Sequence, residues 1–398
     1  MKKRIISAIG FVILTLIGLI YISDYDYILN AVSKIYFKGH TTAYLDDYKQ
    51  FDNNIIPPSE NPQAWPKHKK YNSINLSEDL ENYHKKTQTV AFVLIKNDSI
   101  YFEKYYDNYA PDSKSNSFSM AKSYVSALLG KAIMQGHIRS LDQMVKDFIP
   151  ELKGSYADKV TVGDLASMAS GQLWDEAYYS PVSVTTAAYF VNDLDNLILG
   201  QPIDEIPGKK YIYKSGTTQL LGMVISKATG KNLTEYLYET LWNPMGFEFD
   251  GYWQVDSAEK GVEKAYCCIA SNAKDFARLA KLYKNHGKWN GKVLLDSAFV
   301  SKSTKPRFQE SPEYGYSWWL KEYKGHKVFM MRGHLGQYVI TFPEEDLILV
   351  RLGHSIGPKK PIKDEFTEDI YIYMDAVSYT HLRAHETEAD VVCRLLLE

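Results

Sequence analysis

The 398-residue chain has few cysteines and no excess of charge of either sign. Its three cysteines, two of them adjacent (Cys267 and Cys268), cannot build the disulfide framework of a small secreted protein, and no Cys-x-x-Cys pair is present for a structural zinc. We expect the adjacent pair to be buried as small apolar side chains without a vicinal disulfide. Lys and Arg number 46 against 48 Asp and Glu and form no long basic run, which argues against nucleic-acid binding.

The remaining composition is that of a globular protein. Hydrophobic residues make up 45% of the chain and charged residues 24%, and 31 tyrosines are present. This apolar content is sufficient for a sizeable core and excludes a disordered or fibrous chain. The length allows two or three domains, or one large domain with two lobes.

The N-terminus carries a possible membrane signal. Residues 5–22 form an uncharged run behind Met1-Lys2-Lys3-Arg4, long enough to cross a bilayer as a helix. No Ala-x-Ala-like cleavage site follows, so the pattern favours an uncleaved signal anchor over residues 1–22. Because positive charges stay in the cytoplasm, we expect a membrane-anchored protein whose residues after 22 are extracytoplasmic, in the periplasm of a bacterium.

The C-terminus has a different character. Residues 378–398 resemble the translation of a sequencing adapter, and we interpret them as an artefact rather than as natural sequence. The segment contains Cys393 and the pair His381 and His385, which at helical spacing could pass for a zinc site. We therefore assign neither to an evolved structure and predict no metal site.

Between these ends, the pattern changes from strands to helices and back. Residues 23–85 are rich in Tyr, Asn and Pro and are predicted to be an N-terminal extension or stalk. Residues 89–95 and 99–105 are typical of a β-hairpin, a one-sided buried helix is predicted over 119–136, and further helices extend to about residue 250. Later strands are predicted at 316–322, 327–331, 337–342 and 347–352. This order predicts an α+β fold in which the first hairpin and the last strands pair in one antiparallel sheet, with a helical lobe inserted at about 120–250 and a cleft between them.

The first candidate for chemistry is the Ser-x-x-Lys sequence of Ser119 and Lys122. Spacing i, i+3 on a helix places both side chains on one face, so the amine can reach the hydroxyl. Backbone N–H groups at the helix start can stabilise an oxyanion, and a desolvated lysine can act as a base. The pattern is common and also occurs at Ser257-Lys260 and Ser271-Lys274, but only Ser119 heads the most apolar helix.

The second candidate is Tyr213, with Ser215 two residues later. A phenol beside an ammonium can transfer a proton to a leaving group, and the Ser215 hydroxyl could hold the lysine by a hydrogen bond. The same spacing of Tyr and a small polar residue also occurs elsewhere, for example at Tyr106-Asn108, Tyr178-Ser180 and Tyr283-Asn285.

The third candidate is the sequence His334-Leu335-Gly336, between two of the late strands. A glycine there lets substrate approach the backbone closely, and the N–H of Gln337 could complete an oxyanion hole with that of Ser119. Trp174 and Tyr178 follow a predicted helix stop and either line the cleft or pack as a Tyr-rich loop on the sheet.

Together, the three motifs in this order resemble the serine hydrolases of the class C β-lactamase and penicillin-binding-protein superfamily. The resemblance extends over residues 86–377 and implies a β-lactamase/transpeptidase-like fold. It also implies that Ser119 is the acylated nucleophile, Lys122 its general base and Tyr213 a proton shuttle, with no metal or organic cofactor.

Two departures from that family bear on the substrate. Ser215 stands where β-lactamases usually carry Asn, and His334 where many carry the Lys that binds the β-lactam carboxylate. The resemblance therefore favours an esterase or amidase of the kind related to 6-aminohexanoate-dimer hydrolases, acting on a small-molecule ester, amide or peptide without an obligate protein partner. A penicillin-binding protein or D-amino-acid peptidase, a weak β-lactamase and a non-catalytic binding protein are the alternatives.

Overall fold

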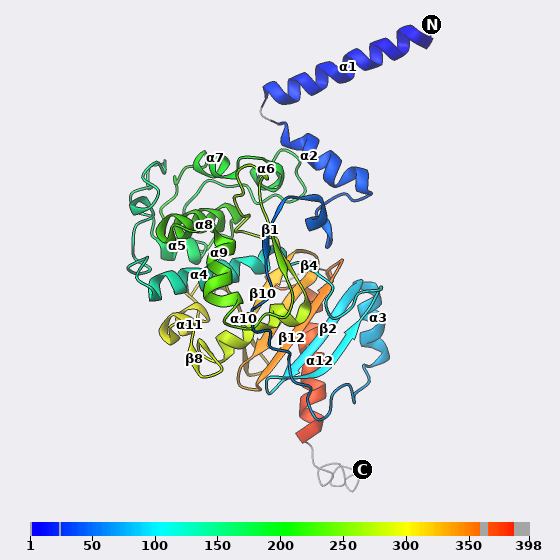
Figure 1. The fold of residues 1–398 in the computed structure, drawn as a ribbon, viewed down its shortest axis with the longest axis vertical. Helices are drawn as coiled ribbons and strands as arrows, with labels where there is room; N and C mark the ends of the chain where they lie inside the picture. Colours follow the sequence, from blue (N-terminus) through cyan, green and yellow to red (C-terminus); the bar gives the residue numbers. More distant parts are fainter. Residues whose placement is uncertain (1, 24, 359–364, 386–398) are drawn as a thin grey trace.

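The computed structural model of the protein describes residues 2–23, 25–358 and 365–385 (Figure 1). Its main sheet is antiparallel, with strand order β3-β2-β12-β11-β10-β9. The strands are β2 (Thr89–Lys96), β3 (Ser99–Tyr105), β9 (Trp319–Tyr323), β10 (His326–Gly333), β11 (Gln337–Phe342) and β12 (Leu347–Gly353). Because β2 pairs with β12, the early hairpin and the late strands form one sheet, which confirms the predicted α+β topology.

Helices cover both faces of this sheet. In β2, Val93 and Ile95 belong to one apolar cluster, whereas Phe92 and Leu94 belong to the other. The first cluster includes side chains of α10 (Ala273–Lys284), and the second includes side chains of α3 (Glu78–Lys86) and α12 (Glu368–His385). Burial on both faces explains why the sequence of β2 is continuously apolar rather than alternating.

The helical lobe follows the hairpin, as Figure 1 shows. It contains α4 (Ala121–Met134), α5 (Val162–Ala166), α6 (Val184–Phe190), α7 (Leu194–Leu199), α8 (Ser215–Thr229) and α9 (Leu233–Leu237). Helix α4 packs against α8 and is buried at every residue from Ala121 to Gly130. The prediction of burial on one side was therefore wrong, because the lobe and the sheet enclose α4 from several directions.

The N-terminal extension packs against the rest of the chain. Strand β1 (Asn53–Ile56) is an edge of a second antiparallel sheet, with order β1-β5-β6-β4. The other strands of this sheet are β5 (Gly251–Gln254), β6 (Ile269–Ser271) and β4 (Ser115–Asn116). Helix α2 (Tyr27–Lys34) lies against α6. The extension is thus wrapped onto the protein over these elements.

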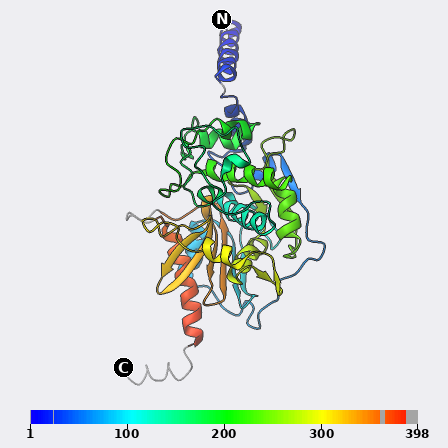
Figure 2. The same cartoon turned by 90° about the vertical axis from the view of Figure 1, so that its left-hand side faces the viewer.

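Helix α1 (Lys2–Ile22) projects from the body (Figure 2). Within the described ranges 2–23, 25–358 and 365–385, no helix combines the length and hydropathy that crossing a membrane requires. The membrane-spanning signal anchor predicted for residues 1–22 is therefore not supported. At the other end, the helix that ends at His385 includes residues 378–385 of the predicted artefact. Residues 386–398 and the side chains of His381 and His385 lie outside the described residues.

Cys267 and Cys268 are buried as predicted, at 4% and 0% exposure, but they are joined in a disulfide. The expectation that no vicinal disulfide forms was therefore wrong. Cys268 adopts a left-handed backbone (φ 77°), and a turn of this kind cannot be recognised from two adjacent cysteines in a sequence.

Candidate active site

Ser119 lies in a 3-10 turn, η3 (Phe118–Met120), that leads directly into α4. Phe118 has φ of 46°, which is costly for a non-glycine residue and is common at functional sites. Its N–H donates to Asn116 Oδ1 at 2.9 Å, which helps to hold this conformation. One turn later, Lys122 Nζ donates to Ser119 Oγ at 3.0 Å. The turn therefore presents the hydroxyl directly to the amine.

The other two Ser-x-x-Lys sequences are not arranged in this way. Lys260 forms an ion pair with Asp193, at 2.5 Å, and Lys274 pairs with Glu103, at 3.8 Å. Both lysines therefore face carboxylates. At Ser257 the hydroxyl accepts from the Lys260 backbone N–H, at 3.3 Å, whereas Ser119 accepts from the Lys122 side-chain amine.

Lys122 is only 2% exposed. Besides Ser119, its Nζ donates to Ser215 Oγ at 3.3 Å and to the Tyr266 carbonyl at 2.8 Å, so the predicted hydrogen bond to Ser215 is present. Burial lowers the pKa of Lys122 from 10.5 to about 8, and the nearby Glu176 carboxylate partly opposes this effect. With a pKa of about 8, roughly a tenth of the amine is neutral at pH 7 and able to accept a proton.

Tyr213 completes the predicted catalytic group. Lys122 Nζ lies 4.9 Å from the centroid of its ring. Burial raises the pKa of the Tyr213 phenol, Glu176 raises it further, and a hydrogen bond with Ser119 acts in the opposite direction. The phenol therefore stays protonated at neutral pH, which suits a proton donor and leaves Lys122 as the group that can accept the serine proton.

Glu176 is a site residue that the sequence motifs do not reveal. Its Oε2 accepts from the Ser215 N–H at 2.6 Å, at the first residue of α8. Its Oε1 accepts from Ser215 Oγ at 2.6 Å and from the Tyr178 hydroxyl at 2.5 Å. A carboxylate is stabilised at a helix N-terminus. Glu176 thus connects Tyr178, in its own loop, to Ser215, which accepts a hydrogen bond from Lys122.

The sequence His334-Leu335-Gly336 forms the tight turn between β10 and β11. Leu335 and Gly336 both have positive φ, 60° and 82°, and Arg351 of β12 donates to both of their carbonyls at 3.2 and 2.8 Å. The side chain of Gln337 points toward β12, where its Nε2 donates to the Gly353 carbonyl at 2.7 Å. The backbone N–H of Gln337, rather than its side chain, is therefore the group that could donate a hydrogen bond to an oxyanion. This role stays a prediction.

This turn approaches the nucleophile closely. A Cβ at Gly333 would lie 2.1 Å from the Ser117 carbonyl oxygen, so the end of β10 packs backbone to backbone against the segment that carries Ser119. The His334 ring lies 5.5 Å from Phe118 and 5.9 Å from Tyr178, between centroids. Burial lowers the pKa of His334 to about 4, so the imidazole is neutral at physiological pH.

A cavity of about 130 Å³ opens in front of Ser119. Ser119, Ser215, His334 and Tyr178 are among the residues that line it, as the sequence predicted. Trp174 does not belong to the described lining. The Trp174 ring packs so closely on Gly216 that a Cβ added to this glycine would lie 2.3 Å from the ring. The Trp174 Nε1 donates to Thr185 Oγ1 at 2.8 Å. Trp174 therefore packs against α8 and α6, and neither the predicted lining of the cleft nor packing on the sheet describes its contacts.

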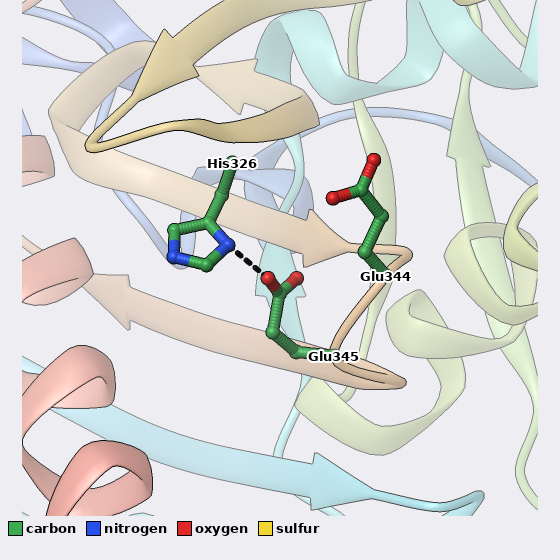
Figure 3. A group of neighbouring side chains, drawn as sticks. All are labelled: His326, Glu344 and Glu345. Atoms are coloured by element: carbon green, nitrogen blue, oxygen red, sulfur yellow. Dashed lines mark ion pairs between the residues drawn. The ribbon is translucent and has the colours of Figure 1, made fainter.

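One group of potential metal ligands is present among the described residues, at the other end of β10 (Figure 3). His326 starts β10 and forms an ion pair with Glu345, and Glu344 lies beside them. The strand from His326 to Gly333 spans roughly 25 Å at 3.3 Å per residue. This group is therefore remote from Ser119 and takes no part in the arrangement around the serine.

Comparison with known proteins was consistent with this geometry. Residues 76–369 match the Beta-lactamase family model. The chain is 25% identical over 302 residues to a 6-aminohexanoate-dimer hydrolase of Paenarthrobacter ureafaciens, covering 70% of this chain and 76% of that protein.

Two solved structures share the fold. A candidate 6-aminohexanoate-dimer hydrolase from Bacillus anthracis superimposes with a TM-score of 0.69 at 20% identity, covering 85% of this chain and 93% of the other. A penicillin-binding protein from Bacillus halodurans superimposes with a TM-score of 0.60 at 15% identity, covering 76% of this chain and 99% of the other. The family match spans well over half of the sequence. The chain therefore belongs to the Beta-lactamase family and is a hydrolase with that family's fold.

Proposed function

We propose that the protein is a serine hydrolase that cleaves an ester or amide bond through an acyl-enzyme on Ser119. The observation that carries the proposal is the contact of Ser119 Oγ with Lys122 Nζ, at 3.0 Å, in an environment that lowers the lysine pKa to about 8. An unactivated serine is a weak nucleophile, and a buried amine with a lowered pKa is one of the groups that can activate it.

Acylation begins with neutral Lys122. The amine accepts the proton of Ser119 while Oγ forms a bond to the substrate carbonyl carbon, and the carbonyl oxygen becomes an oxyanion. The backbone N–H groups of Ser119 and Gln337 are the proposed donors to that oxyanion. The contacts of Nζ with Ser215 Oγ and the Tyr266 carbonyl orient the amine, so its lone pair is directed to Ser119.

Tyr213 then protonates the leaving group. Its phenol donates to the departing oxygen or nitrogen as the carbonyl re-forms, and the phenol regains a proton from the Lys122 ammonium. In deacylation, a water takes the place of the leaving group, gives its proton to the same pair and attacks the acyl carbon, which releases the acid and regenerates the Ser119 hydroxyl. Tyr213 is suited to this exchange because its raised pKa keeps it protonated between steps.

The uncharged lining of the pocket favours an ester or amide over a β-lactam or a peptide whose carboxylate must be held there. His334 lines the pocket and its pKa of about 4 leaves it uncharged at neutral pH. Recognition of a carboxylate gains strongly from a positive partner, and an uncharged imidazole supplies a much weaker one.

The test is intact-mass spectrometry of the full chain after separate incubations with a fluorophosphonate, with p-nitrophenyl acetate and with benzylpenicillin. We expect one adduct and steady ester turnover, both lost in Ser119→Ala and both retained in Ser257→Ala, which alters another Ser-x-x-Lys serine. A fluorophosphonate adduct that persists in Ser119→Ala would contradict the assignment. A stable penicillin adduct with no ester turnover would instead identify a penicillin-binding protein.

We also propose that the hydrolase domain lies outside the cytoplasm. The support is the order of charges in the sequence, since Lys2, Lys3 and Arg4 precede the uncharged run 5–22. Alkaline phosphatase fused after residue 376 should be active in a bacterial host. Activity of a β-galactosidase fusion at the same position, with an inactive phosphatase fusion, would overturn this proposal.

A further inference from the structure

The pocket in front of Ser119 is partly built by a segment that precedes the family domain. Helix α2 and the chain that follows it contribute seven of the lining residues, namely Ile28, Ala31, Ile35, Tyr36, Thr41, Thr42 and Ala43. The family match begins only at residue 76. One wall of the pocket therefore comes from sequence outside the matched domain.

This segment is docked by specific contacts. The Tyr27 hydroxyl donates to the Pro181 carbonyl at 3.1 Å, and Asn30 Nδ2 donates to the Phe190 carbonyl at 2.9 Å. Ala31 and Ile35 are 8% and 2% exposed and belong to an apolar cluster that also includes Phe190 of α6. Helix α2 is thus fixed to α6, which forms another part of the same wall.

The lining of the pocket is uncharged. None of its described residues is Asp, Glu, Lys or Arg, and its one histidine, His334, is neutral near pH 7. The part of the lining that α2 and the following residue contribute is aliphatic, with Ile28, Ala31 and Ile35. A charged group would lose its hydration here without gaining a charged partner, whereas an apolar group would gain from leaving water.

The position of Tyr213 decides which part of the substrate occupies this pocket. Tyr213, the proposed donor to the leaving group, contacts Ser119 but is not among the described residues that line the pocket. The leaving group must reach Tyr213, so it lies on that side of Ser119. The acyl group lies on the other side and stays attached to Ser119 throughout both steps.

We infer that α2 and residues 41–43 complete an acyl-binding subsite, and that the substrate is an ester or amide of an uncharged, apolar acyl group longer than acetyl. The inference rests on the proposed function and extends it to a substrate class. Each additional methylene that is fully buried in the transition state raises kcat/KM about fourfold. Burial of two or more methylenes of a hexanoyl chain therefore gives at least a tenfold preference over acetyl.

The experiment measures kcat/KM of the full chain for p-nitrophenyl acetate and p-nitrophenyl hexanoate. We expect the hexanoate-to-acetate ratio to be at least ten, and to fall at least tenfold in Ala31→Phe, which fills the pocket. Ser33→Phe introduces the same side chain at an exposed position of the same helix and should keep the wild-type ratio. A wild-type ratio near or below one, or equal ratios in the wild type and Ala31→Phe, would overturn the inference.

A second variant guards against a local loss of structure in Ala31→Phe. Ile35→Ala removes wall volume, so the preferred chain should lengthen and the octanoate-to-hexanoate ratio should rise at least threefold. An unchanged or lower ratio would count against the subsite. Turnover of acetate that survives Ser119→Ala would refute the proposed function itself, whereas Ser119-dependent turnover without any chain-length preference would refute only the subsite.

Discussion

Glu176 connects the charges of the site, because its carboxylate raises the pKa values of both Lys122 and Tyr213. Lys122 has to be neutral to accept the serine proton, so activity should increase with pH through its pKa of about 8. Glu176→Gln removes the negative charge that favours the ammonium. We therefore expect the acid limb of the kcat/KM profile to move to lower pH in this variant.

The control for this prediction is Asp175→Asn, which removes an exposed carboxylate next to Glu176 in the chain. Its acid limb should coincide with that of the wild type. If Glu176→Gln lowers activity equally at every pH without moving the limb, the carboxylate acts only by holding Ser215 in place. The profile, rather than the rate at one pH, therefore distinguishes an electrostatic role from a structural one.

His334 allows a second test at the scale of single residues. Its ring is neutral and its Nε2 is buried without a partner among the described residues. His334→Lys would place a cation beside Ser119, and a charged hydrogen bond to a carboxylate is worth about 1.5–3 kcal/mol. We expect this variant to be acylated by benzylpenicillin at least tenfold faster than the wild type, as followed by intact mass. His334→Gln, which stays neutral, should show no such gain.

At the scale of elements, the site depends on how closely β10 approaches η3. Gly333 has an ordinary extended backbone (φ −127°), so a larger side chain there meets a steric obstacle rather than a backbone penalty. Gly333→Ala would bring a Cβ within 2.1 Å of the Ser117 carbonyl oxygen. We expect the free energy of unfolding to decrease by about 1–3 kcal/mol and ester turnover to fall severalfold, because the strand must move away from the nucleophile.

The comparison variant is Gly200→Ala, at the end of α7, where the nearest atom would be 3.3 Å away. Chemical denaturation and ester turnover of both variants check the prediction. A Gly333→Ala protein with wild-type stability and turnover would show that the two backbones are less tightly packed than the structure has them. Equal losses in the two variants would mean that the effect is not specific to this contact.

The same elements show what the sequence can and cannot reveal. The hairpin and the four late strands follow from segments of five or more residues that are rich in aliphatic and aromatic side chains and bounded by turns, and they were predicted within a few residues. Strands such as β4 and β6, of two and three residues, are too short to show any periodicity. Ser119 and Lys122 could be proposed from their spacing on one helix, whereas Glu176 meets Ser215 across 39 residues and no local pattern marks such a contact.

At the scale of the whole molecule, the N-terminal extension is the clearest example of this limit. The Tyr-, Asn- and Pro-rich composition of residues 23–85 and their lack of sustained periodicity predicted an N-terminal extension or a stalk without deciding between them. In the structure, this extension supplies an edge strand to the second sheet and a wall to the pocket. Both roles depend on tertiary contacts with α6 and β5, which only the folded chain brings together.

A histidine buried between α3 and the main sheet should control the stability of the fold in acid. His84 of α3 is 1% exposed, and its Nδ1 lies 3.0 Å from Thr89 Oγ1 of β2. Burial, together with the nearby positive charges of Arg351 and Lys104, lowers the pKa of His84 from 6.5 to about 3. Between pH 6.5 and 3 the unfolded chain therefore binds a proton that the folded protein rejects, so stability falls as the pH falls through this window.

His84→Phe removes this proton while keeping an aromatic ring beside Phe92 and Tyr373. The free energy of unfolding, measured in urea at a series of pH values, should therefore depend less on pH in the variant than in the wild type. The difference between the two curves should change by roughly 3 kcal/mol between pH 7 and pH 4.

The control is His137→Phe, at an exposed position, whose curve should run parallel to that of the wild type. Asp47, whose pKa burial raises to about 6, acts in the opposite direction in every variant and cancels in the comparison. Parallel curves for His84→Phe and the wild type would show that His84 takes up its proton over the same pH range in the folded and unfolded states, which would contradict its burial as a neutral ring.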